Sequence, residues 1–287
     1  MPDKVFFNDG LVDAEQAHIP VADSGFLYGA GLFETMRSRN GVVFRLEDHL
    51  DRLFQSAAKL AIHHDYDKNF LADAVKSVLE ANELTEARLR LTLTNGPINE
   101  TAEQAKPTLL ITAAALQLYP SEYYQTGAMV VLCPFRQNTT EPICGHKTTN
   151  YYPRLLALTL ARQKEAAEAL WFTADNRLAE GCVSNVFLVK DGVLQTPLLE
   201  TPVLPGVARK AVCQLAEAES IELVEKDLQI EDLLAAEEVF LTNVVMEVLP
   251  VVSIEQHTVG DGNVGPVTQK LRTKFLETIE KECRSPA

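Results

Sequence analysis

The chain has 287 residues, of which 46% are hydrophobic and 23% charged, and its formal net charge is −14. This length and ordinary composition predict a globular protein of about two domains. The acidic balance argues against a nucleic-acid partner, because phosphate backbones bind basic surfaces. No stretch has the length and apolar character of a membrane span. Five cysteines without metal-ligand spacing indicate reduced thiols in a cytoplasmic protein and no metal site.

The first half of the chain predicts two hairpins, two helices and two strands. Asn-Gly and Asp-Gly turn signals predict hairpins over residues 5–12 and 35–44. Helices are predicted over 46–62 and about 69–82; in the first, apolar residues recur every three to four positions and Arg52 falls on the polar face. Strict alternation predicts a strand over 88–94 with Arg88 and Arg90 on one face, and another strand follows over 107–113.

The second half mixes strands and helices in the same way. Strands are predicted over 128–133 and 238–242, a hairpin over 186–196, and helices over 153–167 and 207–219. Gly260, Gly262 and Gly265 match a dinucleotide-binding spacing, but too few residues follow for a βαβ unit, so we expect a turn before a helix starting near Pro266. These patterns predict an α+β protein with a small domain over 1–115, a linker over 116–127 and a larger domain over 128–287.

Five segments occur in an informative order. They are DSGFLYGAGLFET (23–35), HLDRL (49–53), GHKTTNYYP (145–153), LAEGCVSNVF (178–187) and LPGVAR (204–209). Each alone is a weak signal, but the ordered set resembles the fold-type IV enzymes that depend on pyridoxal 5'-phosphate (PLP). That group comprises the class IV aminotransferases, the D-amino-acid aminotransferases and the aminodeoxychorismate lyases. The resemblance implies a two-domain fold with mixed sheets, whose second domain is barrel-like and packed with helices.

The resemblance also implies roles for individual residues. Lys147 would form a Schiff base with PLP and then move the substrate's Cα proton. Glu180 would hold the proton on the pyridine nitrogen, and the helix beginning after Gly206 would bind the phosphate through its N–H groups. The implied cofactor-binding set is Arg52, Lys147, Tyr151, Glu180, Ser184, Asn185, Leu204, Gly206, Val207, Ala208, Thr242, Asn243 and Val244.

This chain departs from the family pattern at two phosphate positions. The family usually has threonine where this chain has Ala208 and Val244. The phosphate would therefore depend on backbone N–H groups, on Arg52, and on Thr242 or Asn243. Some lyase members lack the same two hydroxyls.

Substrate recognition and assembly are also implied. Arg88 and Arg90 would bind a substrate carboxylate, because a guanidinium matches that group, and Tyr28 and Phe33 would wall the pocket. The resemblance implies a homodimer acting on a small-molecule substrate.

The branch of the family is less clearly indicated. Asn150 and Tyr151 follow Lys147 at the spacing of the D-amino-acid aminotransferases and lyases, yet an Arg-x-His carboxylate trap is missing after Gly96. The favoured interpretation is an aminotransferase that moves an amino group between a small amino acid or amine and a 2-oxo acid in a ping-pong cycle. The alternatives are an aminodeoxychorismate lyase that releases pyruvate and 4-aminobenzoate, and a non-catalytic PLP-binding protein. Substrate, stereochemistry and acceptor stay open.

Overall fold

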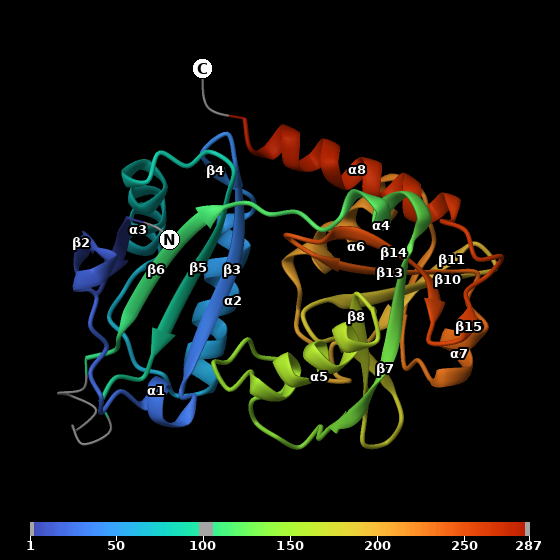
Figure 1. Ribbon diagram of the computed structural model, residues 1–287, viewed down its shortest axis with the longest axis horizontal. Helices are drawn as coiled ribbons and strands as arrows, with labels where there is room; N and C mark the ends of the chain where they lie inside the picture. The colour runs from blue at the N-terminus through green and yellow to red at the C-terminus, as the bar shows by residue number, and fades with distance from the viewer. Residues whose placement is uncertain (1–2, 98–105, 285–287) are drawn as a thin grey trace. The chain divides into compact units, whose positions relative to one another are not determined.

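The computed structural model describes residues 3–97 and 106–284 (Figure 1). The chain forms two compact units, each described separately below. Unit 1 comprises Met1–Gln117, His146–Tyr151 and Ile279–Ala287, and unit 2 comprises Leu118–Gly145 and Tyr152–Thr278. The domain boundaries at 115 and 128 stay a prediction, because compactness alone does not show that a segment folds independently.

Unit 1 contains, in its described residues, a six-stranded antiparallel sheet with the order β2-β1-β6-β5-β3-β4. Its strands are β1 (Lys4–Phe7), β2 (Gly10–Asp13), β3 (Gly31–Arg39), β4 (Val42–Val43), β5 (Ala87–Thr94) and β6 (Leu109–Ala115). A 3-10 turn (Ala14–Gln16) and the short helix α1 (Ser24–Tyr28) precede β3. Both predicted hairpins are confirmed: β1 pairs with β2, and β3 with β4.

Two amphipathic helices, α2 (Leu46–Lys59) and α3 (Lys68–Ala81), pack on the six-stranded sheet. Leu50 and Leu53 of α2 and Val75 of α3 join one buried cluster with the inward residues of β5, such as Leu91. This burial is the main reason that the helices form where the spacing predicts them. Helix α2 ends at Lys59 rather than 62, because Ala61 adopts a left-handed conformation with φ 51°.

Unit 2 is built on a nine-stranded mixed sheet, counted over its described residues, that curls as a half barrel (Figure 1). The order is β12-β11-β10-β13-β14-β7-β8-β9, and β15 pairs with β14. The strands are β7 (Ala128–Gln137), β8 (Glu168–Thr173), β9 (Leu178–Gly181), β10 (Asn185–Lys190), β11 (Val193–Pro197), β12 (Leu223–Lys226), β13 (Glu238–Asn243), β14 (Glu247–Ile254) and β15 (His257–Thr258). Parallel pairs join β11 to β12, β14 to β7 and β7 to β8. The predicted α+β class with a barrel-like second part is confirmed.

The helices of unit 2 differ from the prediction at three places. The helices are α4 (Ser121–Thr126), α5 (Tyr152–Gln163), α6 (Val207–Ala218), α7 (Ile230–Leu234) and α8 (Pro266–Glu282), whose residues after Thr278 belong to unit 1. The segment predicted as a linker contains α4, which starts after Pro120 and ends before Gly127, a glycine with φ 83°. Helix α5 ends at Gln163 rather than 167, because Glu165 turns the chain at φ 61°. The sequence patterns do not predict α7, whereas α8 begins at Pro266 as expected.

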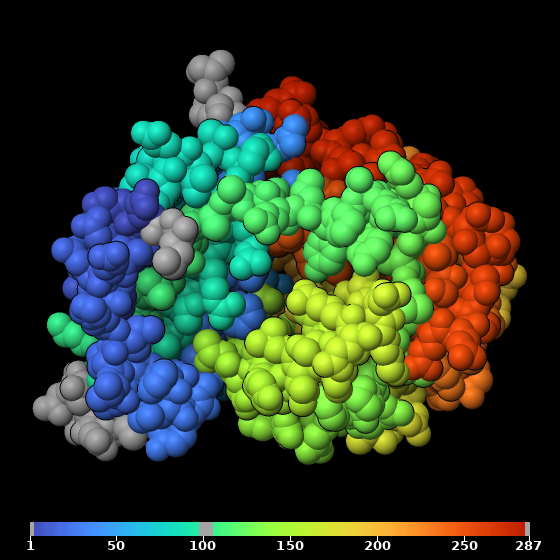
Figure 2. Space-filling model, viewed as in Figure 1, coloured from blue at the N-terminus to red at the C-terminus, as the bar shows by residue number. Residues whose placement is uncertain are grey.

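Helix α5 positions residues that matter for the site. It packs on β7 and β8 through Ala157, Leu158 and Ala161, which join a buried cluster with Trp171. Its outer face is part of the surface of unit 2, visible as the yellow-green band in Figure 2. Over the ranges that the structure describes, no helix is both long and apolar enough to cross a membrane.

Candidate active site

The backbone of Lys147 is attached to the edge of β3. Phe33 N donates to Lys147 O at 2.9 Å, and Thr149 N donates to Gly31 O at 2.8 Å. A Cβ on Gly31 would lie 2.9 Å from a backbone oxygen of β5 and 3.0 Å from Thr149 Oγ1, so this close approach requires glycine. Gly31, the first residue of β3, therefore makes room for the lysine segment, and these hydrogen bonds fix where the Lys147 side chain begins.

The Lys147 amine lies among aromatic rings and another cation. Its Nζ is 4.4 Å from the ring centroid of Phe33 and 5.6 Å from that of Tyr151. The two rings meet edge to face, with centroids 5.1 Å apart. Arg90 Cζ stands 3.9 Å from the Phe33 centroid, and both burial and the neighbouring Arg88 lower the pKa of Arg90. Unit 1 thus brings together Lys147, Tyr151, Phe33 and Arg90.

Glu34, next to Phe33 on β3, holds a buried polar cluster against α2. Arg52 donates from Nε to Glu34 Oε1 at 2.9 Å and from Nη2 to Oε2 at 2.5 Å. His49 Nδ1 lies 2.7 Å from Glu34 Oε2 and donates to it, because an ionised carboxylate only accepts. Although Arg52 falls among the polar residues of its helix, only 8% of it is exposed, because Glu34 binds its guanidinium.

The charges in this cluster have clear electrostatic consequences. Burial alone would raise the pKa of Glu34, but the Arg52 charge and the hydrogen bonds from His49 and Arg52 lower that pKa to about 2. Burial lowers the pKa of His49, and the positive charges of Arg52 and Lys147 act in the same direction. The pair Glu34–Arg52 is therefore ionised at neutral pH, with a neutral imidazole beside it.

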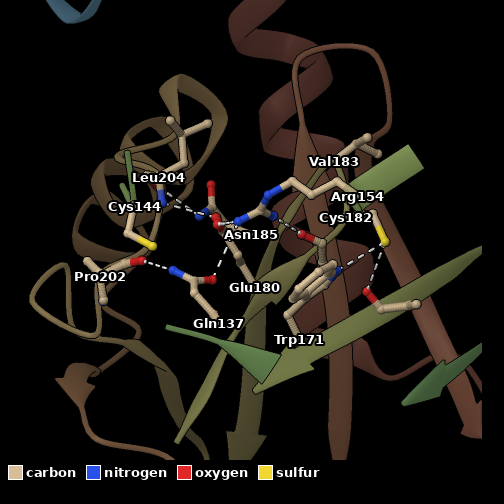
Figure 3. Close-up of polar contacts among 12 residues, drawn as sticks. Gln137, Cys144, Arg154, Trp171, Glu180, Cys182, Val183, Asn185, Pro202 and Leu204 are labelled. Carbon is tan, nitrogen blue, oxygen red and sulfur yellow. Dashed lines mark hydrogen bonds and ion pairs between the residues drawn. The ribbon is translucent and has the colours of Figure 1, made fainter. Parts of the chain in front are cut away.

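In unit 2, Glu180 at the end of β9 has partners on both carboxylate oxygens (Figure 3). Arg154 Nη2 donates to Oε1 at 2.5 Å, and the backbone N–H of Leu204 donates to Oε2 at 3.0 Å. Only 4% of Glu180 is exposed. These bonds hold the carboxylate in one orientation. No sequence pattern points to Arg154, which lies in the predicted helix that follows the lysine motif.

Glu168, the first residue of β8, supports the turn that follows Glu180. Its carboxylate accepts from Cys182 N at 3.0 Å, Val183 N at 3.1 Å and Ser184 Oγ at 3.0 Å. Burial raises the pKa of Glu168, while these donors act in the opposite direction. Ser184, predicted to bind the cofactor, thus has its hydroxyl turned to Glu168. Sequence reasoning missed Glu168 because an acidic residue before an apolar run has no distinctive spacing.

The start of α6 has the properties of an anion site. No side chain caps this helix at Gly206, so the first N–H groups, at Val207 and Ala208, are suited to an anion. Asn185 Nδ2 donates to Leu204 O at 2.9 Å, and a Cβ on Gly206 would meet Asn185 Oδ1 at 2.0 Å. The Asn185 side chain thereby packs directly on Gly206, where a Cβ would displace it.

The turn after β13 uses its predicted cofactor-binding side chains internally. Thr242 Oγ1 donates to Glu247 O at 2.6 Å. Asn243 donates to Val183 O at 3.0 Å and accepts from Met246 N at 2.7 Å. Val244 is buried. The Thr242 and Asn243 side chains therefore hold this turn together through internal hydrogen bonds.

Two further substrate candidates, Tyr28 and Arg88, are much more exposed than Phe33. Tyr28, the last residue of α1, is 69% exposed. Arg88 is exposed and pairs across the sheet with Arg37 of β3. The missing Arg-x-His motif after Gly96 concerns residues 98–105, which lie outside the described residues.

The residues present fit PLP, group by group. The phosphate needs an uncapped helix N-terminus, which α6 provides. The pyridine nitrogen needs an oriented carboxylate, which Glu180 provides, and the aldehyde needs an amine, which Lys147 provides. Among the described residues, no cluster of three histidine, cysteine or acidic side chains is arranged to hold a metal ion.

Comparisons with known proteins point to one family. The family model for amino-transferase class IV matches residues 31–254. A Methanocaldococcus jannaschii protein provisionally named a branched-chain-amino-acid aminotransferase is 34% identical, with 97% of each chain covered. The D-alanine aminotransferase of Listeria monocytogenes is 30% identical, covering 98% of this chain and 97% of that protein.

A solved structure agrees with these relatives. The branched-chain amino acid aminotransferase of Escherichia coli superposes with a TM-score of 0.92 at 29% identity, covering 99% of this chain and 97% of that one. The agreement extends over nearly the whole chain and therefore over every motif described above. The chain belongs to the class IV aminotransferase family and is an enzyme with the fold-type IV architecture.

Proposed function

We propose that this enzyme is a PLP-dependent aminotransferase that moves an amino group between a small amino acid or amine and a 2-oxo acid in a ping-pong cycle. The observation that carries the proposal is the Lys147 amine, which lies 4.4 Å from the Phe33 ring on a backbone fixed to β3. An amine that must form and break a covalent bond needs a backbone that is fixed in position. The aminotransferase names of the two relatives support transfer rather than elimination.

Lys147 would have two roles in turn. When bound, PLP supplies an electron sink that makes the substrate's Cα proton acidic and a carrier for the amino group. Lys147 would hold the cofactor covalently in the resting enzyme. After the substrate's amino group displaces Lys147, the released amine would accept the proton from Cα and donate it to another atom later in the transfer. The Phe33 and Tyr151 ring centroids lie 4.4 Å and 5.6 Å from Nζ, so these rings would line the place where the amine reacts.

The remaining cofactor contacts would be made by residues that are already oriented. We propose that Glu180 holds the proton on the pyridine nitrogen and that the N–H groups of Val207 and Ala208 bind the phosphate. Arg52 would add a positive charge for the phosphate, with Glu34 fixing its guanidinium. Leu204, whose N–H is bonded to Glu180, would pack on the ring.

Arg90 is the preferred anchor for a substrate carboxylate. Its guanidinium contacts the Phe33 ring, and the Lys147 amine contacts the same ring, so the two cations lie close to one aromatic side chain. We propose that Phe33 and Tyr151 contact the substrate side chain, with Arg88 and Tyr28 in supporting roles.

A homodimer is also proposed. Phe26 and Tyr28 of α1 are 72% and 69% exposed, and Val21 before it is 84% exposed. Helix α1 forms part of the surface of unit 1, drawn in blue in Figure 2. Exposed apolar side chains gathered in one short segment are typical of a protein interface. Light scattering on the purified protein tests this, and a monomer at micromolar concentration would contradict it. The cytoplasmic location stays a prediction.

The deciding experiment mixes the PLP-loaded enzyme with a panel of D- and L-amino acids and small amines. We expect at least one of them to convert the bound cofactor to its amine form, seen by absorbance, and a 2-oxo acid to reverse the change. The same preparation is assayed for pyruvate release from aminodeoxychorismate. Pyruvate release much faster than any conversion of the cofactor would show that the enzyme is a lyase. Failure to bind PLP would contradict both functions.

A further inference from the structure

Arg154 makes the most direct charged contact with Glu180, and no motif of the chain accounts for it. It lies in the first turn of α5, with 22% of its side chain exposed. Nη2 donates to Glu180 Oε1 at 2.5 Å, and Nη1 donates to the carbonyl oxygen of Gly181 at 3.0 Å (Figure 3). The guanidinium therefore binds a carboxylate and the backbone that carries it at the same time.

The guanidinium is held by its surroundings as well as by Glu180. Its Cζ lies 5.5 Å from the Trp171 ring centroid, and the Trp171 indole N–H donates to Cys182 Sγ at 3.3 Å. On another side, Gln137 Oε1 lies 3.5 Å from Nη2, and Gln137 Nε2 donates to Pro202 O at 2.5 Å. A guanidinium that lies near an aromatic ring and is hydrogen-bonded through two nitrogens loses little further conformational entropy when it binds a carboxylate.

The other titratable groups around this pair include Cys133, Cys144, Cys182 and Glu168, and burial also raises the pKa of the Cys182 thiol. Burial raises the pKa of the Cys133 thiol and of the Cys144 thiol, so both stay protonated at neutral pH. Glu168 has its carboxylate committed to the turn at 182–184. Arg154 is thus the cation that faces Glu180 from α5, and a guanidinium stays charged at every working pH.

We propose that Arg154 is a positioning residue for Glu180: it fixes the carboxylate and, by sharing its negative charge, limits how strongly Glu180 can hold a proton on the ring nitrogen of the cofactor. The inference rests on the proposed PLP-dependent function and refines it. A carboxylate paired with a guanidinium is a weaker base and a weaker partner for a second cation than a lone carboxylate. The ring nitrogen should therefore lose its proton more readily than beside an unpaired glutamate.

The test follows the ring nitrogen directly. PLP labelled with ¹⁵N in the ring is bound to the wild type and to Arg154→Met, and the nitrogen's NMR shift is followed across pH. We expect the pKa of the ring nitrogen to rise in Arg154→Met by at least about one unit, a tenfold change in the protonation equilibrium. The matched control is Arg162→Met, which removes a positive charge from an exposed position of the same helix and should leave the titration unchanged.

Two further variants make the outcomes separable. Arg154→Lys keeps the positive charge but not the guanidinium group with its two hydrogen-bonding nitrogens, so the pKa of the ring nitrogen should fall between those in wild type and Arg154→Met. This variant also replaces Arg154→Met in the test if Arg154→Met fails to fold. Glu180→Gln should lower the ring-nitrogen pKa whether or not Arg154 is present. A titration that is the same in wild type, Arg154→Met and Arg154→Lys would overturn the role of Arg154 while leaving the proposed function intact. PLP that does not attach to Lys147 would overturn both.

Discussion

Glu34 and Arg52 form a buried two-point ion pair, with Arg52 Nε 2.9 Å from Oε1 and Nη2 2.5 Å from Oε2. The pair joins β3 to α2 in unit 1, one residue from Phe33, whose ring contacts the Lys147 amine. A guanidinium that is hydrogen-bonded through two of its nitrogens has a fixed orientation. The same contact therefore fixes a helix on its sheet and orients the arginine that we propose as a phosphate ligand.

Removing this carboxylate should be costly at neutral pH. Glu34→Gln leaves the buried Arg52 charge without its partner, and we expect a loss of about 3–5 kcal/mol in the free energy of unfolding. Chemical denaturation of both proteins at pH 7 measures the difference. The control is Glu80→Gln, which removes an exposed helix pair with Lys76 and should cost less than about 1 kcal/mol. Equal effects of the two substitutions would contradict the pairing.

The same pair predicts how stability depends on pH. The pKa of Glu34 is lowered from 4.5 to about 2 in the folded state, so the unfolded chain takes up its proton first as the pH falls. The stabilisation is fully present above pH 4.5 and is lost towards pH 2, a change of about 3 kcal/mol. Denaturation of wild type and Glu34→Gln across this range should show their difference shrinking. A difference that stays constant would mean that Glu34 does not titrate as described.

Lys147 should be the attachment point of the cofactor. Borohydride reduction of the PLP-loaded protein should fix the label on the peptide that contains Lys147, because its amine lies beside the rings of Phe33 and Tyr151. Peptide mass spectrometry locates the label. Lys147→Ala should abolish labelling, whereas Lys164→Ala, at an exposed position after α5, should not change it. Labelling of another lysine in the wild type would refute the site assignment.

Glu180 should control the rate of proton removal more than cofactor binding. Glu180→Gln keeps the size of the side chain but removes the charge that would stabilise a protonated ring nitrogen. We expect the half-reaction with an amino acid to slow by at least about tenfold, equivalent to about 1.4 kcal/mol in the barrier. Stopped-flow absorbance measures the rate. A half-reaction as fast as in the wild type would show that Glu180 has another role.

Gly206 should be required for phosphate binding. A Cβ there would lie 2.0 Å from Asn185 Oδ1, so Gly206→Ala must displace either the Asn185 side chain, which bonds Leu204 O, or the start of α6. We expect PLP affinity to fall by at least about tenfold, or about 1.4 kcal/mol. Gly10→Ala is the control, since a Cβ at that position has nothing within 4 Å. Equilibrium dialysis compares the two, and unchanged affinity in Gly206→Ala would place the phosphate elsewhere.

Arg90 and Arg88 share a strand face but should differ in function. Arg90 lies on the Phe33 ring, and Arg90→Ala should raise KM for the amino acid by about 10–100-fold, the cost of one charge-assisted hydrogen bond. Its effect on kcat should be smaller, as expected when binding in the ground and transition states weakens equally. Arg88→Ala is the matched comparison on the next outward position. A larger rise in KM for Arg88→Ala would assign the carboxylate to Arg88.

Local patterns in the sequence determined much of this protein by themselves. The turn at Asn40-Gly41 and the apolar spacing of residues 46–62 predict β3–β4 and α2, because hairpin turns and helix faces depend on neighbouring residues. The order of the motifs around Lys147 and Glu180 identified the family that the comparisons show. The start of α8 at Pro266 follows from the restricted φ of proline.

Only the tertiary structure decided which charges are buried and what balances them. Arg52 lies on the helix face that carries the polar residues, yet it is buried because Glu34, on a different element, neutralises its charge. Arg154 and Glu168 have no signal in the sequence, since their partners lie on other strands and turns. Periodicity reports which side of an element avoids water. It carries no information about which distant group satisfies a buried charge, and that pairing exists only once the strands and helices are packed.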